Sequence, residues 1–511
     1  MKMKRWICCL WCALAFSGLA EEAQSDEAKD DKEKPAEKEK KADKEEAPSV
    51  THHKVVIAGK EIAYTATAGT LPIMASNDKD VRAHVFYIAY TLDDVEDSTK
   101  RPVTFSFNGG PGSSAVWLHM GVFGPRRVKL NDDGSPPPPP YHLVDNEFSI
   151  LDKTDLVFID PVSTGYSRAT DEKKAKEFHG VAEDIESVGE FIRLYITRHN
   201  RWGSPKYVGG ESYGTLRAAG LSGHLQQRHG MFLNGLLLVS SVLEFQTLRF
   251  GNGNDLPYVL FLPSYTAAAW YHKKLPPDLQ QKPLAEVLKL AEAFAMDAYS
   301  VSLLKGASLP EADYVKITKQ LARFTGLSEA YIAQANNKVS QSRFSKELLR
   351  DERRTVGRMD SRFKGVDSDA AGESMQWDPS LTGLMGPFTA TFKDYVRREL
   401  AYEKDMPYEI LSRKVHPWSY DAYENKYVNV AGTLREAITH NPALKIFVGS
   451  GYADMATPYL ATDYTLNRLG LEPHLRANIQ TYYYDAGHMM YANRPDLEKL
   501  KRDLDHFFKK P

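Results

Sequence analysis

The sequence predicts an α/β fold built on a mixed, mostly parallel sheet that is interrupted by a helical insertion. Two observations indicate the sheet. Residues 53–92 alternate apolar and polar side chains in "HKVVIAG", "IAYTATAG" and "HVFYIAYTL", which is typical of antiparallel strands with one face toward a core. Further on, "VTFSF", "DLVFI", "KYVGG" and "GLLLVS" are short, mostly apolar runs between glycine-rich turns and helical stretches, as in buried parallel strands.

A third observation, the loss of this strand pattern in the second half of the chain, predicts the insertion. After "GLLLVSSVLEF" the sequence carries amphipathic helical patterns such as "LAEVLKLAEAFAMDAYSVSLL", and strand-like runs return at "LKIFVGS" and "IQTYYYD". An insertion after a core strand emerges beside the carboxyl ends of the parallel strands, where such folds bind ligands. We therefore predict a core at 49–245, a helical cap over the active site at 246–425, and the C-terminal part of the core at 426–511.

The N-terminal 20 residues are predicted to be a signal peptide. "MKMKRWICCLWCALAFSGLA" combines three basic residues, an apolar run and small residues at its end, the pattern of a cleaved secretory signal. An uncleaved membrane anchor is the alternative, although the run is shorter than the ~20 apolar residues that a span needs. All three cysteines lie here, so we expect no disulfide in the mature protein. We expect a secreted or periplasmic protein without a stable membrane span.

Residues 21–48 are predicted to be a disordered spacer. They consist almost entirely of Glu, Asp, Lys and Ala, and such segments cannot bury enough apolar surface to fold. The spacer has 12 acidic and seven basic residues, the signal has three basic residues, and the whole chain has a net charge of −2. The remaining residues 49–511 are therefore neutral, which gives no electrostatic reason to expect nucleic acid or an anionic membrane as a partner.

The segment 210–214, "GESYG", matches the nucleophile-elbow motif G-x-S-x-G. A serine at a sharp strand-to-helix turn needs small neighbours, because the backbone there is strained. The strand-like "KYVGG" precedes the motif and the helix-like "LRAAGLSGHLQQ" follows it. We therefore predict that Ser212 is a nucleophile; a glycine-rich turn with an inert serine is the alternative. The motif and the sheet together predict an α/β-hydrolase fold.

A nucleophilic serine needs a general base and an acid that orients the base. In α/β-hydrolases the chain order is serine, acid, histidine. His488 lies in a loop directly after a late strand, in "YYYDAGHMMYANRP", and Asp454 lies after a strand in "FVGSGYADMATP". We predict the catalytic set Ser212, Asp454 and His488. Asp485 is a rival acid that precedes the histidine by three residues.

The oxyanion of an acyl-transfer reaction needs backbone N–H donors, one of them from the residue after the nucleophile and one from an earlier loop. The residue after the nucleophile is Tyr213. The glycine-rich "FSFNGGPGSS" follows a strand, so its glycines can approach the substrate closely. We predict an oxyanion hole from Tyr213 and from this loop, in which Gly109 and Gly110 are the candidate donors.

The motifs "NGGPGSS", "FGPRRV", "FIDPVSTGYS", "GGESYG", "GYADMATP" and "AGHMMYANRP", in this order, resemble the serine carboxypeptidase family of the carboxypeptidase Y and cathepsin A type. The resemblance implies an α/β-hydrolase fold with an inserted cap and the catalytic set named above. It implies an oxyanion hole from Gly110 and Tyr213. It also implies that Asn108, Gly109 and Glu211 bind the free carboxylate of a peptide substrate. Carboxyl groups facing that carboxylate cannot all be ionised, so Glu211 would stay protonated and donate a hydrogen bond to it.

The sequence departs from this family pattern at two positions. A second glutamate of the carboxylate network falls at Val122, and a disulfide cysteine falls at Ser113. The missing cysteine predicts a bacterial-type member whose loops are held by packing. The missing glutamate weakens the case for strict carboxypeptidase specificity and for a strongly acidic optimum. The hypothesis is that Asn108 and Glu211 recognise the carboxylate alone.

The sequence therefore favours a secreted serine carboxypeptidase that acts on peptides with a free C-terminus. An esterase or acyltransferase with the same triad is the alternative, and a non-catalytic binding protein on a hydrolase scaffold is a third hypothesis. The sequence contains no H-E-x-x-H, no G-x-x-x-x-G-K-[ST] and no dinucleotide fingerprint, so we expect no cofactor and no metal. It does not indicate an oligomeric state.

Overall fold

The computed structural model describes residues 46–75 and 80–509. The predicted signal peptide, the three cysteines and residues 21–45 of the predicted spacer lie outside the described residues. Of the helices in the described ranges, none combines the length and the hydropathy that a bilayer crossing requires.

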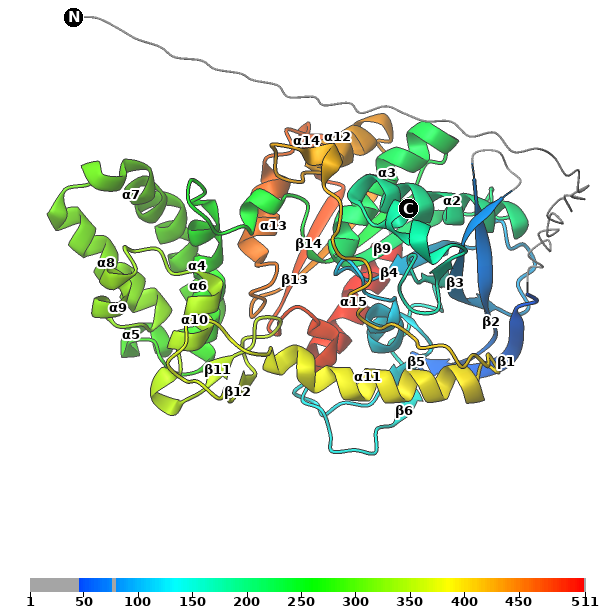
Figure 1. The fold of residues 1–511 in the computed structure, drawn as a ribbon, viewed down its shortest axis with the longest axis horizontal. Coiled ribbons are helices and arrows are strands. Elements are labelled where there is room, and N and C mark those ends of the chain that lie inside the picture. The colour runs from blue at the N-terminus through cyan, green and yellow to red at the C-terminus, as the bar shows by residue number, and fades with distance from the viewer. Residues whose placement is uncertain (1–45, 76–79, 510–511) are drawn as a thin grey trace, which may run out of the picture. The chain divides into compact units, whose positions relative to one another are not determined.

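A ten-stranded mixed sheet forms the centre of the fold, with the order β1-β2-β3-β7-β4-β9-β10-β13-β14 and with β8 paired to β3 (Figure 1). β1, β2, β3 and β7 pair antiparallel in turn, and every pair from β7 to β14 is parallel. This agrees with the predicted fold class and with the predicted positions of the strands. The strands are β1 (Ser49–Ile57), β2 (Lys60–Met74), β3 (Val81–Leu92), β4 (Val103–Phe107), β7 (Asp155–Ile159), β8 (Arg168–Ala169), β9 (Lys206–Ser212), β10 (Gly235–Ser241), β13 (Lys445–Gly451) and β14 (Ile479–Tyr484).

Helices cover both faces of the sheet because the parallel strands are apolar on both faces. In β10, Leu236 and Leu238 belong to one core cluster, whereas Leu237 and Val239 belong to the opposite one. The first cluster includes side chains of α2 (Val181–Arg198), α3 (Tyr213–His229) and α12 (Ala431–His440). The second includes side chains of α1 (Val116–Leu118), the π-helix η1 (His119–Phe123), α11 (Pro379–Arg398) and α15 (Arg494–Lys509).

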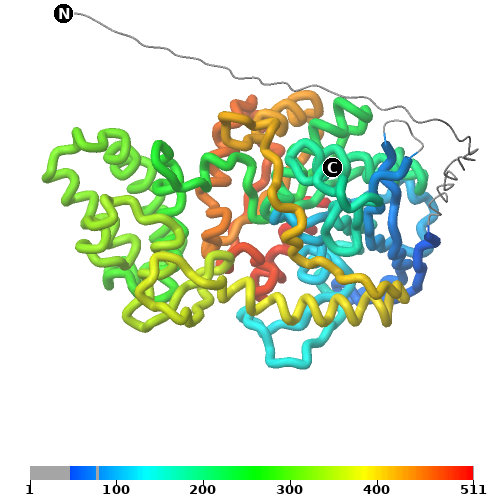
Figure 2. Tube along the Cα trace, in the orientation of Figure 1, coloured from blue at the N-terminus to red at the C-terminus, as the bar shows by residue number. Residues whose placement is uncertain are grey.

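The chain leaves the sheet after β10 and returns to it at β13 (Figure 2). The first part of this excursion is a helical cluster with its own apolar core, in which Tyr265 stacks on Phe344 with ring centroids 4.1 Å apart. Its first helix packs against α13 (Tyr459–Asn467) of the sheet domain. The helices are α4 (Leu256–Tyr271), α5 (Pro277–Gln280), α6 (Leu284–Phe294), α7 (Ser300–Lys305), α8 (Glu311–Thr325), α9 (Glu329–Gln334) and α10 (Gln341–Glu347).

The later part of the excursion packs differently. α11 buries Leu384, Phe388, Phe392 and Tyr395 in the same cluster as the sheet, and Phe388 contacts Trp117 with ring centroids 4.8 Å apart. These positions recur at helical spacing, so one apolar stripe of α11 faces the sheet domain. The predicted boundaries of the cap, at 246 and 425, stay a proposal. Although α11 lies between these boundaries in the sequence, its buried apolar side chains pack with the sheet domain and not in the core of the helical cluster. Two short hairpins complete the fold: β5 (Arg126–Val128) with β6 (Leu143–Asp145), and β11 (Thr355–Val356) with β12 (Lys364–Gly365).

Candidate active site

Ser212 occupies a strained turn between β9 and α3, with φ of 58° and ψ of −130°. Such a conformation costs about 1–3 kcal/mol for a residue other than glycine. The turn is so tight that a Cβ on Gly210 would lie 2.2 Å from the carbonyl oxygen of Gly214. The turn therefore requires glycine at 210, and its geometry at Ser212 is that of a nucleophile elbow.

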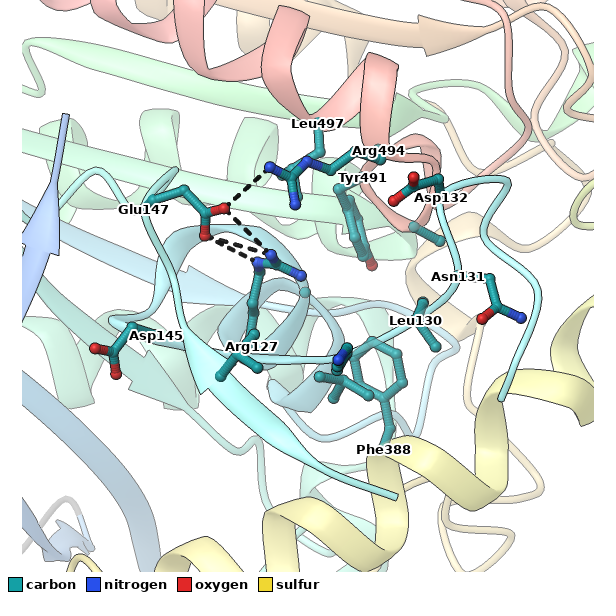
Figure 3. A pocket seen from close by; sticks show the side chains of 15 residues that line it. Arg127, Leu130, Asn131, Asp132, Asp145, Glu147, Phe388, Tyr491, Arg494 and Leu497 are labelled. Atoms are coloured by element: carbon teal, nitrogen blue, oxygen red, sulfur yellow. Dashed lines mark hydrogen bonds and ion pairs between the residues drawn. The ribbon is translucent and has the colours of Figure 1, made fainter. Parts of the chain in front are cut away.

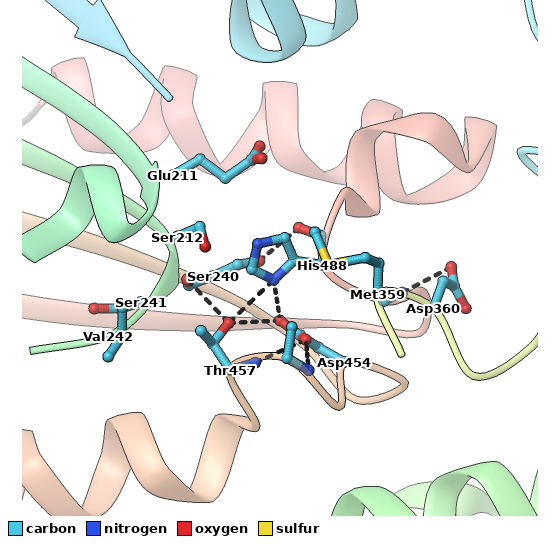
Figure 4. Close-up of polar contacts among 12 residues, drawn as sticks. Glu211, Ser212, Ser240, Ser241, Val242, Met359, Asp360, Asp454, Thr457 and His488 are labelled. Atoms are coloured by element: carbon cyan, nitrogen blue, oxygen red, sulfur yellow. Dashed lines mark hydrogen bonds and ion pairs between the residues drawn. The ribbon is translucent and has the colours of Figure 1, made fainter. Parts of the chain in front are cut away.

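Asp454 and His488 lie in the loops that follow β13 and β14, and both side chains are fully buried. His488 Nδ1 lies 2.7 Å from Asp454 Oδ2 (Figure 4). The other carboxylate oxygen, Oδ1, accepts the backbone N–H groups of Ala456 and Thr457 at 2.7 and 3.0 Å. The Thr457 hydroxyl donates to Oδ2 at 2.7 Å. Asp454 therefore has four donors, which stabilise its buried negative charge.

The surroundings of His488 favour the positively charged form of its ring, in which both nitrogens are protonated. Burial lowers the pKa of His488, but the charge of Asp454 and its hydrogen bond outweigh burial, so the pKa lies above the usual histidine value. A histidine held in this way is suited to take up a proton from a nucleophile.

The Ser212 hydroxyl faces the ring edge of His488 that carries Nε2 (Figure 4). Within the described residues Nε2 is buried without a hydrogen-bond partner, so the serine and the histidine lie near each other without a formed hydrogen bond. Catalytic hydrogen bonds are commonly long or poorly aligned before substrate binds. The rival acid Asp485 is exposed, and no hydrogen bond of the described residues joins it to the ring.

A loop of the helical excursion fixes the two loops that carry Asp454 and His488. The sequence did not indicate these contacts. The N–H of His488 donates to the Met359 carbonyl at 2.6 Å, and the N–H of Met455 donates to the Arg358 carbonyl at 3.0 Å. The N–H of Gly487 donates to Asp360 Oδ2 at 3.0 Å. Residues 358–360 thus hold both loops in place.

The loop after β4 lies directly against the start of α3. A Cβ on Gly109 would lie 2.4 Å from the backbone nitrogen of Tyr213, so the two backbones approach as closely as glycine allows. The buried Arg217 of α3 donates to the Asn108 carbonyl at 2.7 Å and ties the same loop to the helix. Tyr213 is the first residue of α3, so its N–H has no acceptor within the helix. This arrangement supports the predicted oxyanion donors Gly110 and Tyr213.

Asn108 and Glu211 are both buried and both line one cavity beside Ser212. Asn108 Oδ1 accepts the N–H of Leu118 at 3.1 Å, which fixes the amide, whereas Nδ2 has no partner among the described residues. A buried donor without a partner costs free energy unless a ligand accepts from it. Burial raises the pKa of Glu211 to about 7, against the lowering effects of His488, of a hydrogen bond from Tyr491 and of the neighbouring Asn108 amide.

Tyr491 is a partner of Glu211 that the sequence did not indicate. Its hydroxyl donates to Glu211 Oε2 at 2.5 Å. Val122, where the family glutamate falls, lies instead in the apolar core within η1. Glu211 therefore has a tyrosine partner, and recognition of a carboxylate by Asn108 and Glu211 stays a prediction. Ser113, where a cysteine was expected, accepts a hydrogen bond from Trp117 Nε1 at 2.9 Å.

The ring of Tyr491 also lines a second cavity of about 320 Å³, which Ser212 does not line (Figure 3). There Glu147 forms ion pairs with Arg127 at 3.3 Å and with Arg494 at 3.2 Å. The lining of this cavity balances in charge, with three basic and three acidic side chains: Arg127, Lys129, Arg494, Asp132, Asp145 and Glu147. Across the described ranges no group of three or more His, Cys, Asp or Glu side chains is arranged to hold a metal ion.

Two cavities meet at Ser212. The Glu211 cavity, about 350 Å³, is lined by Asn108, Glu211 and His488 among others. The Phe250 cavity, about 230 Å³, is lined by Val242, Phe250 and Phe261 among others. Glu211 and Val242 lie on opposite sides of Ser212 in Figure 4. The arrangement suits a substrate that crosses the serine, with one part in each cavity.

Comparisons with known proteins agree with this geometry. A family profile described as serine carboxypeptidase matches residues 65–494. The pheromone-processing carboxypeptidase KEX1 of Saccharomyces cerevisiae is 34% identical over 138 residues, 26% of this chain and 18% of that protein. Serine carboxypeptidase-like 29 of Arabidopsis thaliana is 30% identical over 143 residues, 27% of each chain. These matches span less than a third of either relative's length.

The fold resembles that of a solved carboxypeptidase structure. The crystal structure of Kex1(delta)p, a prohormone-processing carboxypeptidase from Saccharomyces cerevisiae, superposes with a TM-score of 0.53. The sequence identity is 18%, and the match covers 87% of this chain and 91% of that chain. At this identity the likeness concerns the fold, and it identifies the sheet and helices as an α/β-hydrolase fold.

We predict that Gly109→Ala slows covalent labelling of the protein by a fluorophosphonate about 100-fold or more. The added Cβ pushes the loop away from the start of α3, and losing one oxyanion donor costs roughly 10² to 10³ in rate. Gly432→Ala is the matched control, because its Cβ meets nothing within 4 Å. Circular dichroism melting verifies that both variants fold. A labelling rate for Gly109→Ala within about twofold of the unmodified protein would contradict the assignment.

Proposed function

The chain belongs to the serine carboxypeptidase family, and we propose that it is a secreted enzyme that releases C-terminal residues from peptides. Peptide substrates follow from the family. The finer statements, namely a free C-terminus on the substrate and export from the cytoplasm, are part of the proposal. Export is supported by the signal-like residues 1–20.

The proposed reaction proceeds through an acyl-enzyme on Ser212. The Ser212 oxygen attacks the carbonyl carbon of the last peptide bond while His488 Nε2 takes the hydroxyl proton. The N–H groups of Gly110 and Tyr213 stabilise the oxyanion of the tetrahedral intermediate. His488 returns the proton to the leaving nitrogen, and the terminal amino acid departs. Water then attacks the ester with the same general base, releasing the shortened peptide and free Ser212. Asp454 orients the imidazole and stabilises its charge throughout.

One observation carries the exopeptidase proposal: a buried amide donor and a buried acid stand side by side in the Glu211 cavity. Asn108 Nδ2 is that donor. Glu211 is protonated below its pKa of about 7 and then offers an O–H donor. A terminal carboxylate in this cavity would accept both hydrogen bonds, which places the last peptide bond over Ser212. Hydrogen bonds to a charged group contribute about 1.5–3 kcal/mol each.

We predict that a blocked dipeptide with a free C-terminus has a kcat/KM at least about tenfold above that of its C-terminal amide, because the amide cannot accept as a carboxylate does. Ser212→Ala abolishes turnover of both peptides. Equal kcat/KM values for the two peptides would contradict carboxylate recognition. Equal values together with faster cleavage of a simple ester would favour the esterase or acyltransferase alternative.

We predict that kcat/KM for the free-acid dipeptide falls as the pH rises above about 7, the pKa of Glu211. The ionised form loses its donor and repels the substrate carboxylate, so the fall approaches about tenfold per pH unit. In Glu211→Gln the side chain is a donor at every pH, so this alkaline fall disappears. An ester without a carboxylate is the control substrate and shows no such fall. An alkaline fall that persists unchanged in Glu211→Gln would refute the role of this residue.

A further inference from the structure

The Phe250 cavity lies on the side of Ser212 where the acyl part of a substrate belongs. If the terminal carboxylate occupies the Glu211 cavity, as the proposed function requires, the residue before the scissile bond points into the Phe250 cavity. The inference below therefore rests on the proposed function and concerns which side chain this second cavity selects.

Two arginines give this cavity its charge. Arg249 and Arg358 both line it, and none of its other lining residues is an aspartate or a glutamate. In the part of the chain that the structure describes, no acidic side chain forms an ion pair with either arginine. In a folded body without net charge, two guanidinium groups without an ion-pair partner form a distinct positive site.

Both arginines are anchored close to the serine. The N–H of Met455 donates to the Arg358 carbonyl, and the N–H of Arg358 donates to Asp378 at 3.3 Å. Arg358 also lines the Glu211 cavity, so it stands where the two cavities join. The guanidinium of Arg249 lies over the Phe245 ring, 5.3 Å from its centroid.

The walls of the Phe250 cavity strengthen these charges. Phe261 is buried, and Phe250 packs edge-on against it with ring centroids 4.8 Å apart. Both arginines are exposed at the mouth of the cavity. Apolar walls lower the effective dielectric beside them, so their charges act more strongly there than on a fully open surface.

We propose that Arg249 and Arg358 are specificity residues that select an acidic side chain, Asp or Glu, immediately before the scissile bond. The apolar walls contact the methylene groups of that side chain, and its carboxylate reaches the guanidinium groups at the mouth. A basic side chain at the same position meets two like charges and is disfavoured.

The test compares N-blocked Glu-Leu with N-blocked Gln-Leu, which have nearly the same shape and differ in charge. Measurements are made at about pH 6, where the glutamate side chain is ionised. We expect the ratio of kcat/KM for the Glu peptide to that for the Gln peptide to be about ten at low salt. The ratio should fall toward one at about 1 M salt, where the Debye length is about 3 Å.

Substitutions test whether the two arginines cause the preference for the Glu peptide. Arg249→Gln and Arg358→Gln are each expected to lower the Glu/Gln ratio several-fold, and the double variant to bring it close to one. Arg435→Gln is the matched control, because Arg435 is an exposed arginine on α12 that lines neither cavity. The ratio cancels any general loss of activity, so a partly impaired variant still reports on charge selection.

The outcomes separate the two proposals. Cleavage of both peptides at equal rates, or a ratio that neither arginine variant changes, overturns the charge selection and leaves the carboxypeptidase proposal intact. Absence of cleavage of both peptides overturns the proposed function and this inference with it. A preference for the Glu peptide that disappears in the double variant and persists in Arg435→Gln supports the inference.

Discussion

The turn between β9 and α3 holds Ser212 in a backbone conformation that non-glycine residues rarely adopt, and the rest of the site is arranged around it. β9 lies between β4 and β10, with β13 and β14 following in order. The loops after parallel strands emerge at the same edge of a sheet. The loop after β4 therefore brings Gly109 and Gly110 to the serine, and the loops after β13 and β14 bring Asp454 and His488. The sheet thus sets the geometry on which every proposed chemical step depends.

Two buried acids beside this serine have different surroundings, which fits them for different tasks. Asp454 accepts four hydrogen bonds, two from backbone N–H groups and two from side chains. Those donors suit a carboxylate that stays negative beside a histidine. Glu211 accepts a hydrogen bond from Tyr491, and burial raises its pKa to about 7. The charges of the two neighbouring groups affect each other, since Glu211 raises the pKa of His488 and His488 lowers that of Glu211, so the two titrations are coupled.

Much of this arrangement could be predicted from the sequence, because strands, glycine turns and the elbow are local patterns. The periodicity of residues 53–92 and the short apolar runs predicted the strands of the sheet. The motifs predicted Ser212, Asp454 and His488, each in a turn or loop at the end of one of these strands. Contacts between distant segments could not be predicted. Tyr491 reaches Glu211 across 280 positions in the sequence, and no local pattern marks that pairing.

The helical excursion illustrates the same limit. Its amphipathic patterns predicted helices, but the main-chain contacts of Arg358 and Met359 with the acid and histidine loops depend on how those helices pack. The apolar stripe of α11 could have been predicted from the sequence, because its members recur at helical spacing: Leu384, Phe388, Phe392 and Tyr395. Periodicity identifies a buried face, whereas the partner of that face is decided by tertiary structure.

The central claim is that the site combines a serine nucleophile with recognition of a terminal carboxylate. A crystal structure of the Ser212→Ala variant with an N-blocked dipeptide tests it most directly. The account predicts that the terminal carboxylate lies within about 3 Å of Asn108 Nδ2 and of the Glu211 carboxyl group. The last peptide bond should then lie over residue 212, with its carbonyl oxygen facing the N–H groups of Gly110 and Tyr213. A terminal carboxylate that points to solvent, with Asn108 Nδ2 still without a partner, would contradict the account.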